Sequence, residues 1–218
     1  MFDEKTIMML AVGTWDTIYM TIVATFFSYV FGIAMGVILA ITRPGGITPR
    51  RSVYSVLDVI VNLTRSFPFL ILMIAVIPFT RFVVGTTIGN NATIVPLVLS
   101  AAPFVARLVE ASLQEVDRGV IEAAQSMGAT TWQIISRALI PEAMPSLING
   151  SAVAAITILG YSAMAGAVGG GGLGKLAIMY GYNRYQTDIM IVTVILLIII
   201  VQIFQSLGNW ATRRCDNR

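Results

Sequence analysis

The chain has 218 residues, of which 56% are hydrophobic and only 11% are charged, and its mean hydropathy is +0.82. A soluble domain has about 45–50% apolar and about 25% charged residues, so this composition excludes a soluble protein. At about 20 apolar residues per crossing, the chain can form about five or six transmembrane helices and no folded catalytic domain. It contains no histidine and one cysteine, which removes imidazole chemistry and an internal disulfide.

The first long apolar segment extends from about Thr17 to Ile41. A proline and two glycines at positions 44–46 end it, because neither residue type continues a helix easily. The chain starts without the basic residues of a cleaved signal peptide, so we expect this first crossing to be retained. Within it, Gly32 and Gly36 have the spacing of close helix contacts, which would serve internal packing or dimerisation.

The second apolar segment, from about Val53 to Val84, contains Arg65 and the prolines Pro68 and Pro78. Because each proline removes a backbone donor, we expect a kinked helix whose irregular backbone faces protein or a cavity and not lipid. An arginine inside a membrane is costly. Arg65 should therefore lie near the inner interface or pair with an acid such as Asp58.

The third segment runs from about Thr93 to Leu113 and carries Arg107 and Glu110 near its end. Residues three apart lie on one face of a helix, so we expect these two side chains to pair near the membrane surface. The fourth segment, about 145–168, is rich in alanine, glycine and serine. Such small residues let backbones approach closely, which predicts a helix inside the bundle.

The fifth segment, from about Asp188 to Leu207, is bulky and almost featureless, as a lipid-facing helix requires. The sequence thus predicts an all-α integral membrane protein with five transmembrane helices. We find no internal repeat, so residues 1–218 should form a single transmembrane domain. An odd number of helices cannot make two equal halves, and a symmetric pathway would need a second copy of the chain.

The distribution of arginines predicts the orientation of these crossings, because cytoplasmic connections carry an excess of basic residues. The connections after the first and third segments and the tail are rich in arginine, whereas the opposite set is sparser in arginine and partly acidic. We therefore expect the N-terminus outside and the C-terminus in the cytoplasm. The basic clusters, whose placement does not suggest a nucleic-acid surface, are Arg43, Arg50 and Arg51; Arg118 and Arg137; and Arg213, Arg214 and Arg218.

The cytoplasmic connection at about 114–144 is too long for a simple turn. Asp117 can cap a short helix that Gly128 then interrupts. Thr130 and Gln133 have the spacing of a capping box for a second helix, which we expect to end at Pro141. The prediction is two short helices with a bend between them. An amphipathic helix resting on the bilayer is the alternative.

The residue order in this connection resembles the EAA loop of ABC-importer permeases. The sequence reads EAAQSMGATTWQIISRALIP, which has that pattern's Glu-Ala-Ala, its glycine after three further residues and its final apolar residue and proline. The resemblance implies a type I ABC importer permease fold and a coupling helix that docks into a separate cytoplasmic ATPase. It assigns the coupling role to Glu122, Ala123, Ala124, Gly128, Ile140 and Pro141.

The resemblance covers nearly the whole chain and is closest at residues 161–182, which look like the permease of the bacterial methionine importer. It implies an inner-membrane homodimer that works with two ATPase subunits and an extracytoplasmic binding protein. ATP and Mg²⁺ would be used by the partner, with no enzyme activity or cofactor on this chain. Methionine, in D and L forms, is the implied substrate. Another small solute, such as an osmoprotectant or other amino acid, or a non-transporting scaffold or channel, is the alternative.

Residues 169–175 read G-x-x-x-x-G-K, one residue short of a phosphate-binding loop. Position 176 is leucine, where the motif needs a hydroxyl for Mg²⁺, and no predicted strand precedes the glycines. We therefore interpret this stretch as a flexible turn that joins the fourth and fifth segments. Any ATP hydrolysis must then come from a partner.

Met164 is a long, flexible side chain among small residues on the fourth segment. A thioether can fill irregular space and move aside without breaking hydrogen bonds. Met164, together with Tyr161 and Ser162, is therefore a candidate gate or pathway group. Plain core packing is the alternative for Met164, because methionine commonly fills gaps.

Overall fold

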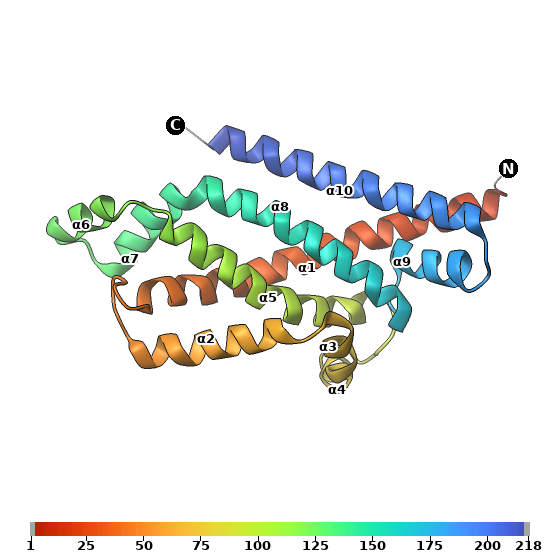
Figure 1. Cartoon of the computed structure of the whole chain (residues 1–218), viewed down its shortest axis with the longest axis horizontal. Coiled ribbons are helices and arrows are strands. Elements are labelled where there is room, and N and C mark those ends of the chain that lie inside the picture. Colours follow the sequence, from red (N-terminus) through yellow and green to blue (C-terminus); the bar gives the residue numbers. More distant parts are fainter. Residues whose placement is uncertain (1–2, 216–218) are drawn as a thin grey trace.

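The computed structural model describes residues 3–215, which form an elongated bundle of helices without a strand (Figure 1). This confirms the predicted all-α fold. The elements are α1 (Glu4–Thr42), α2 (Arg51–Ser66), α3 (Phe69–Ala75), α4 (Ile77–Val84), α5 (Asn90–Gln114), α6 (Arg118–Ser126), α7 (Thr131–Ile134), the π-helix η1 (Ile135–Leu139), α8 (Ile140–Ala165), the 3₁₀ turn η2 (Gly166–Val168), α9 (Gly172–Leu176), the π-helix η3 (Ala177–Tyr182) and α10 (Thr187–Cys215).

Four helical stretches among the described residues are long and apolar enough to cross a membrane, and the bent pair α2–α3 makes a fifth candidate. The five predicted crossings agree with this count. Helix α10 is the least buried of the four, as expected for a helix that faces lipid. Its neighbour α8 lies inside the bundle, between α10 and α5 (Figure 1).

The first and last long helices extend beyond their predicted limits. Helix α1 begins at Glu4, well before Thr17, and α10 continues past Leu207 to Cys215. At 1.5 Å per residue, the 39 residues of α1 span about 58 Å, about twice the thickness of the hydrocarbon core. Hydropathy indicates which part of a helix is apolar enough to cross lipid, and it does not define where the helix begins and ends.

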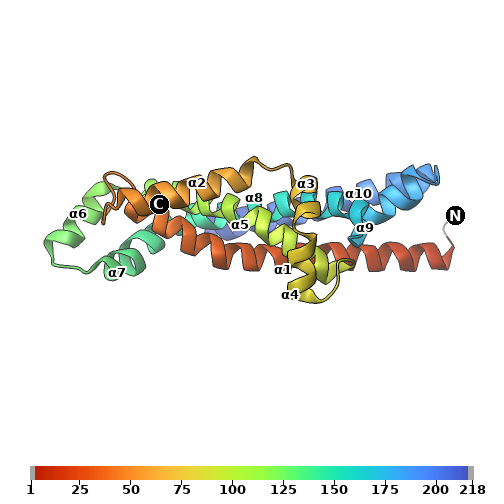
Figure 2. The same cartoon turned by 90° about the horizontal axis from the view of Figure 1, so that it is seen from below.

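The predicted kink in the second segment is a complete break. Helix α2 ends at Ser66 and α3 begins at Phe69, with a bend of 104° between them. Phe67 has an extended backbone, with φ −77° and ψ 129°, because the ring of Pro68 disfavours a helical conformation at the preceding residue. Figure 2 shows α3 and α4 crossing the side of the bundle. The ring of Phe69 anchors α3 by stacking on Tyr161 of α8, with ring centroids 4.7 Å apart.

Glycines allow α1 and α5 to pack closely along the middle of the bundle. Gly32 faces Val105, and Gly36 faces Ala106 and Val109. A Cβ atom added to Gly36 would lie only 2.6 Å from the carbonyl oxygen of Ala106. Without a hydrophobic driving force inside lipid, such close contact supplies the van der Waals attraction that holds helices together. These glycines therefore serve internal packing.

We expect Gly36→Ala to lower the free energy of unfolding by about 1–3 kcal/mol, because the new methyl group forces α1 away from the backbone of α5. The matched control is Gly160→Ala on α8, where a Cβ would meet no described atom within 4 Å. Thermal unfolding of the two purified variants in the same detergent checks the prediction. Equal unfolding temperatures would show that close α1–α5 contact contributes little to stability.

A charged cluster attaches α2 to α5. The predicted pair of Arg107 and Glu110 is present, with 2.6 Å between Nη1 and Oε2. Arg107 also pairs with Asp58 and donates a hydrogen bond to Asn62 Oδ1 at 2.9 Å. The suggested partnership of Asp58 with Arg65 is therefore wrong. Asp58 and Arg65 are seven residues apart on α2, so their backbone positions are separated by about 10.5 Å along the helix axis. Asp58 instead forms its ion pair with Arg107 of α5.

Candidate coupling loop and gate

The first helix of the connection between α5 and α8 is α6, which is fixed at both ends by local hydrogen bonds. Asp117 caps its start as predicted, because its Oδ1 accepts from the amide of Gly119 at 2.6 Å. At its end, Gly128 has φ +76°, a conformation that favours glycine. The amide of Ala129 donates to the carbonyl of Ala124 at 3.1 Å, and that of Gly128 donates to Gln125 at 2.9 Å. This pair of bonds is a Schellman motif, which reverses the chain without help from other elements.

The second helix starts with the predicted capping box. The Thr130 amide donates to Gln133 Oε1 at 2.8 Å, and the Gln133 amide donates to Thr130 Oγ1 at 3.4 Å. The expected end at Pro141 is wrong, since α7, η1 and α8 run on as one span. In the π-turn η1, the amide of Ile140 donates a hydrogen bond to the carbonyl of Ile135. The wider π-turn shifts the hydrogen-bond register just before Pro141. The helix can therefore continue through the proline, which would otherwise interrupt it.

One side of this connection is anchored in the bundle. The buried residues Ile134, Ile135 and Leu139 pack with Leu113 of α5 and Ala143 of α8 in one core cluster. Figure 1 shows α6 and α7 projecting together from one end of the molecule. The buried side thus couples the projecting loop mechanically to two membrane-crossing helices.

The opposite side of the connection faces outward. Of the predicted coupling residues, four are exposed and two, Ala124 and Ile140, are partly buried against the core. Two large apolar side chains, Trp132 and Met127, are also exposed, by 72% and 81%. Exposed apolar groups beside polar ones are typical of a protein contact. The sequence analysis did not single out these two residues. For Trp132, its place on the polar side of a capped helix could have indicated a contact surface. The four exposed coupling residues are Glu122, Ala123, Gly128 and Pro141.

The predicted gate residues lie at the other end of α8. Met164 is 49% exposed on the surface of this subunit. Tyr161 is partly buried by its stacking on Phe69 of α3. Ser162 is buried, and its hydroxyl donates to the carbonyl of Leu159 at 2.8 Å. In this conformation Met164 is therefore the member of the set that is free to contact a solute or a second subunit.

The glycine-rich stretch after α8 is tightly packed, so the expectation of a flexible turn is wrong. A Cβ added to Gly174 would lie 2.2 Å from the carbonyl oxygen of Ala163. The amide of Leu173 donates to Thr17 Oγ1 of α1 at 2.8 Å. The glycines are thus needed for close contact with α8 and α1. Their packing gives the G-x-x-x-x-G-K sequence a structural explanation without a phosphate.

Long apolar helices with a loop that projects from one end are the architecture of a multi-pass membrane protein. Residues 32–218 match the family described as the binding-protein-dependent transport system inner membrane component. The chain belongs to this family. It is therefore a multi-pass inner-membrane subunit of a transport system.

Particular relatives are named for methionine. The chain is 50% identical over 210 residues to the probable D-methionine transport system permease protein MetI of Vibrio cholerae, covering 96% of this chain and 93% of the relative. It is 48% identical over 206 residues to the methionine import system permease protein MetP of Bacillus subtilis, with coverage of 94% and 93%. The structure matches a chain of the inward-facing MetNI methionine ABC transporter with a TM-score of 0.98 and 46% identity, covering 99% of this chain and 100% of that one.

Proposed function

We propose that this chain is the permease of an ATP-driven importer that carries methionine, in D and L forms, into the cytoplasm. The observation that carries the proposal is the TM-score of 0.98 with a methionine transporter chain at 46% identity, over 99% of this chain. Relatives named for methionine transport support the same substrate. The whole chain acts as one transmembrane domain.

ATP and Mg²⁺ are bound by two copies of a separate ATPase, and two copies of this chain enclose the pathway between them. The exposed side of α6 and α7 docks into the ATPase through Glu122, Ala123 and Gly128. Trp132 and Met127 add apolar contact area to the same surface. Closure of the ATPases on ATP then moves the loop and α8 together, which switches the pathway between inward-facing and outward-facing states.

The orientation follows from the docking surface. The coupling loop and the C-terminus lie in the cytoplasm, and the N-terminus lies outside, as the arginine distribution predicts. Figure 1 shows the start of α1 beside the start of α10, at the end of the bundle opposite α6. An extracytoplasmic binding protein delivers substrate at that end, and the long helices contact membrane lipid between the two ends.

The test is uptake of labelled methionine into vesicles that contain this chain, its ATPase and its binding protein. We expect ATP-dependent uptake that unlabelled D- and L-methionine both reduce. Competition by an osmoprotectant or another amino acid, with no effect of methionine, would support the alternative substrate. A chain that purifies without any ATPase would support a scaffold or channel and would overturn the importer.

Met164 is proposed to close the pathway at the far end of α8. We expect Met164→Ala to raise ATP hydrolysis in the absence of substrate and to increase solute leak, because a shorter side chain leaves the seal incomplete. Met144→Ala is the matched control, since Met144 is also exposed on α8 but lies near its start. The reconstituted complex is assayed for both leak and hydrolysis. Wild-type values for Met164→Ala would remove this residue from the gate.

A further inference from the structure

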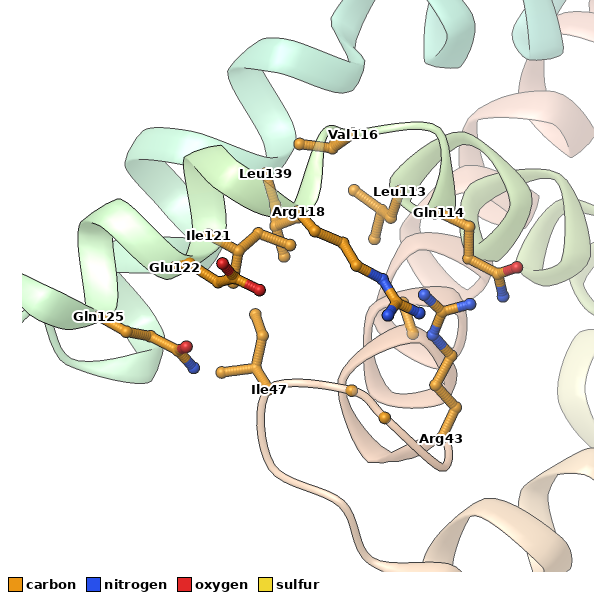
Figure 3. Close-up of a pocket in the computed structure, with 13 residues that line it drawn as sticks. Arg43, Ile47, Leu113, Gln114, Val116, Arg118, Ile121, Glu122, Gln125 and Leu139 are labelled. Carbon is orange, nitrogen blue, oxygen red and sulfur yellow. The ribbon is translucent and has the colours of Figure 1, made fainter.

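A cavity of about 150 Å³ lies between the α1–α2 connection and helix α6 (Figure 3). Its apolar wall includes Ile47, Leu113 and Leu139, and two arginines provide most of its charge. Arg43 follows the last residue of α1, and Arg118 is the first residue of α6. The cavity thus joins the end of a transmembrane helix to the start of the coupling helix.

The two arginines face the same space. Their guanidinium groups point toward one another in Figure 3, while the carboxylate of Glu122 lies apart from them at the other side of the cavity. Among residues 3–215, neither arginine has an ion-pair partner, because both ion pairs there are made by Arg107. Two like charges in one cavity repel each other unless an anion lies between them.

Burial adds a second reason to expect a ligand. The Nε atom of Arg43 is buried and has no hydrogen-bond partner within the described part of the chain. Native structures rarely leave a buried donor without a partner, and those that do require an explanation such as a bound ion. The cavity is well above the roughly 10–15 Å³ that one water needs, so it has room for a polyatomic anion.

Guanidinium groups are well suited to bind phosphate, as they are to bind carboxylate. The planar fork of an arginine matches two phosphate oxygens at once, and two forks can hold one phosphate from opposite sides. The cavity also lies directly after the end of α1, the first apolar helix, and its apolar wall suits the carbon atoms next to a phosphate. A lipid head group and free phosphate share this chemistry.

We propose that this cavity binds a phosphate-bearing anion between Arg43 and Arg118. The bound anion neutralises both guanidinium groups and connects the end of α1 to the first turn of α6. The coupling helix is then held by the anion as well as by its contacts with the core cluster of Ile134 and Leu139.

The test measures thermal unfolding of the complete complex of this chain with its ATPase. One arm uses nanodiscs of neutral phosphatidylcholine with added inorganic phosphate, at an ionic strength matched with chloride. The other arm replaces part of the lipid with phosphatidylglycerol and omits free phosphate. We expect one of these additions to raise the unfolding temperature by several degrees, and the arm that responds identifies the source of the phosphate.

Arg43→Gln and Arg118→Gln should each remove most of that shift. Arg137→Gln is the matched control, because Arg137 is exposed near the same loop and does not line the cavity. Native mass spectrometry of the same samples counts retained phosphate or phosphatidylglycerol, so a variant with low stability still gives a result. No shift in either arm, or the same shift in all three variants, would overturn the proposal. The readout uses no transport and so does not depend on the identity of the substrate.

Discussion

Gly128→Val is expected to abolish most ATP-dependent uptake, by at least tenfold, while the chain still inserts in the membrane. Gly128 has φ +76°, and a residue with a side chain pays about 1–2 kcal/mol to adopt that conformation. A β-branched residue is a genuine outlier there. The Schellman turn would open, and the relative position of Glu122 and Trp132 on the docking surface would be lost. Uptake and ATP hydrolysis are measured in the reconstituted complex.

Two variants separate this effect from general strain. Gly85→Val introduces the same residue at a glycine with φ +80°, at the end of α4 and away from the coupling loop. A Cβ at either glycine would meet no described atom within 4 Å, so the two substitutions differ in place and not in crowding. Gly128→Asn should keep more uptake than valine, because asparagine tolerates this conformation. Equal loss of uptake in Gly85→Val would contradict a specific docking role for Gly128.

Arg107→Gln is expected to lower the free energy of unfolding by about 3–5 kcal/mol. Glu110 is almost completely buried, and a buried carboxylate without its partner is strongly destabilising. The substitution also removes the ion pair with Asp58 and the hydrogen bond to Asn62, which join α2 to α5 beside the apolar packing of Val61. Thermal or denaturant unfolding of the purified chain measures the loss.

The double substitution Arg107→Gln with Glu110→Gln should recover much of this stability, because it removes the buried charge together with its partner. Arg65→Gln serves as the comparison, since Arg65 is exposed on α2 and surface substitutions usually change stability by no more than about 0.5 kcal/mol. If the double substitution is no more stable than Arg107→Gln alone, the pairing with Glu110 does not account for the loss.

Local signals predicted most of the helices and both caps of the coupling loop. The stops after α1 and α2 depend on nearby prolines and glycines, and the bonds of Asp117 and Thr130 join residues at most three apart. Such features depend on neighbouring residues and are visible in the sequence. The coupling residues were assigned by resemblance, because residue spacing alone also fitted an amphipathic helix on a bilayer.

Features that depend on contact between distant segments were not predictable in this way. The pair of Arg107 and Asp58 joins positions 49 residues apart, and Arg43 meets Arg118 only because the loop folds back over the end of α1. The helix continues through Pro141 because a π-turn precedes it, and nothing in the local pattern indicated that turn. The glycines near position 174 likewise allow close packing against α8 and α1, and the sequence does not show that these helices lie beside them.

Residues Thr131 to Val168 form one continuous helical span, which can tilt as a rigid body. These 38 residues extend about 57 Å, so each degree of tilt about the midpoint moves either tip by about half an ångström. A displacement of a few ångströms at the loop tip therefore produces an equal and opposite displacement near Met164, without any change inside the helix. A substitution that lets this helix bend at its middle would reduce the displacement that reaches Met164.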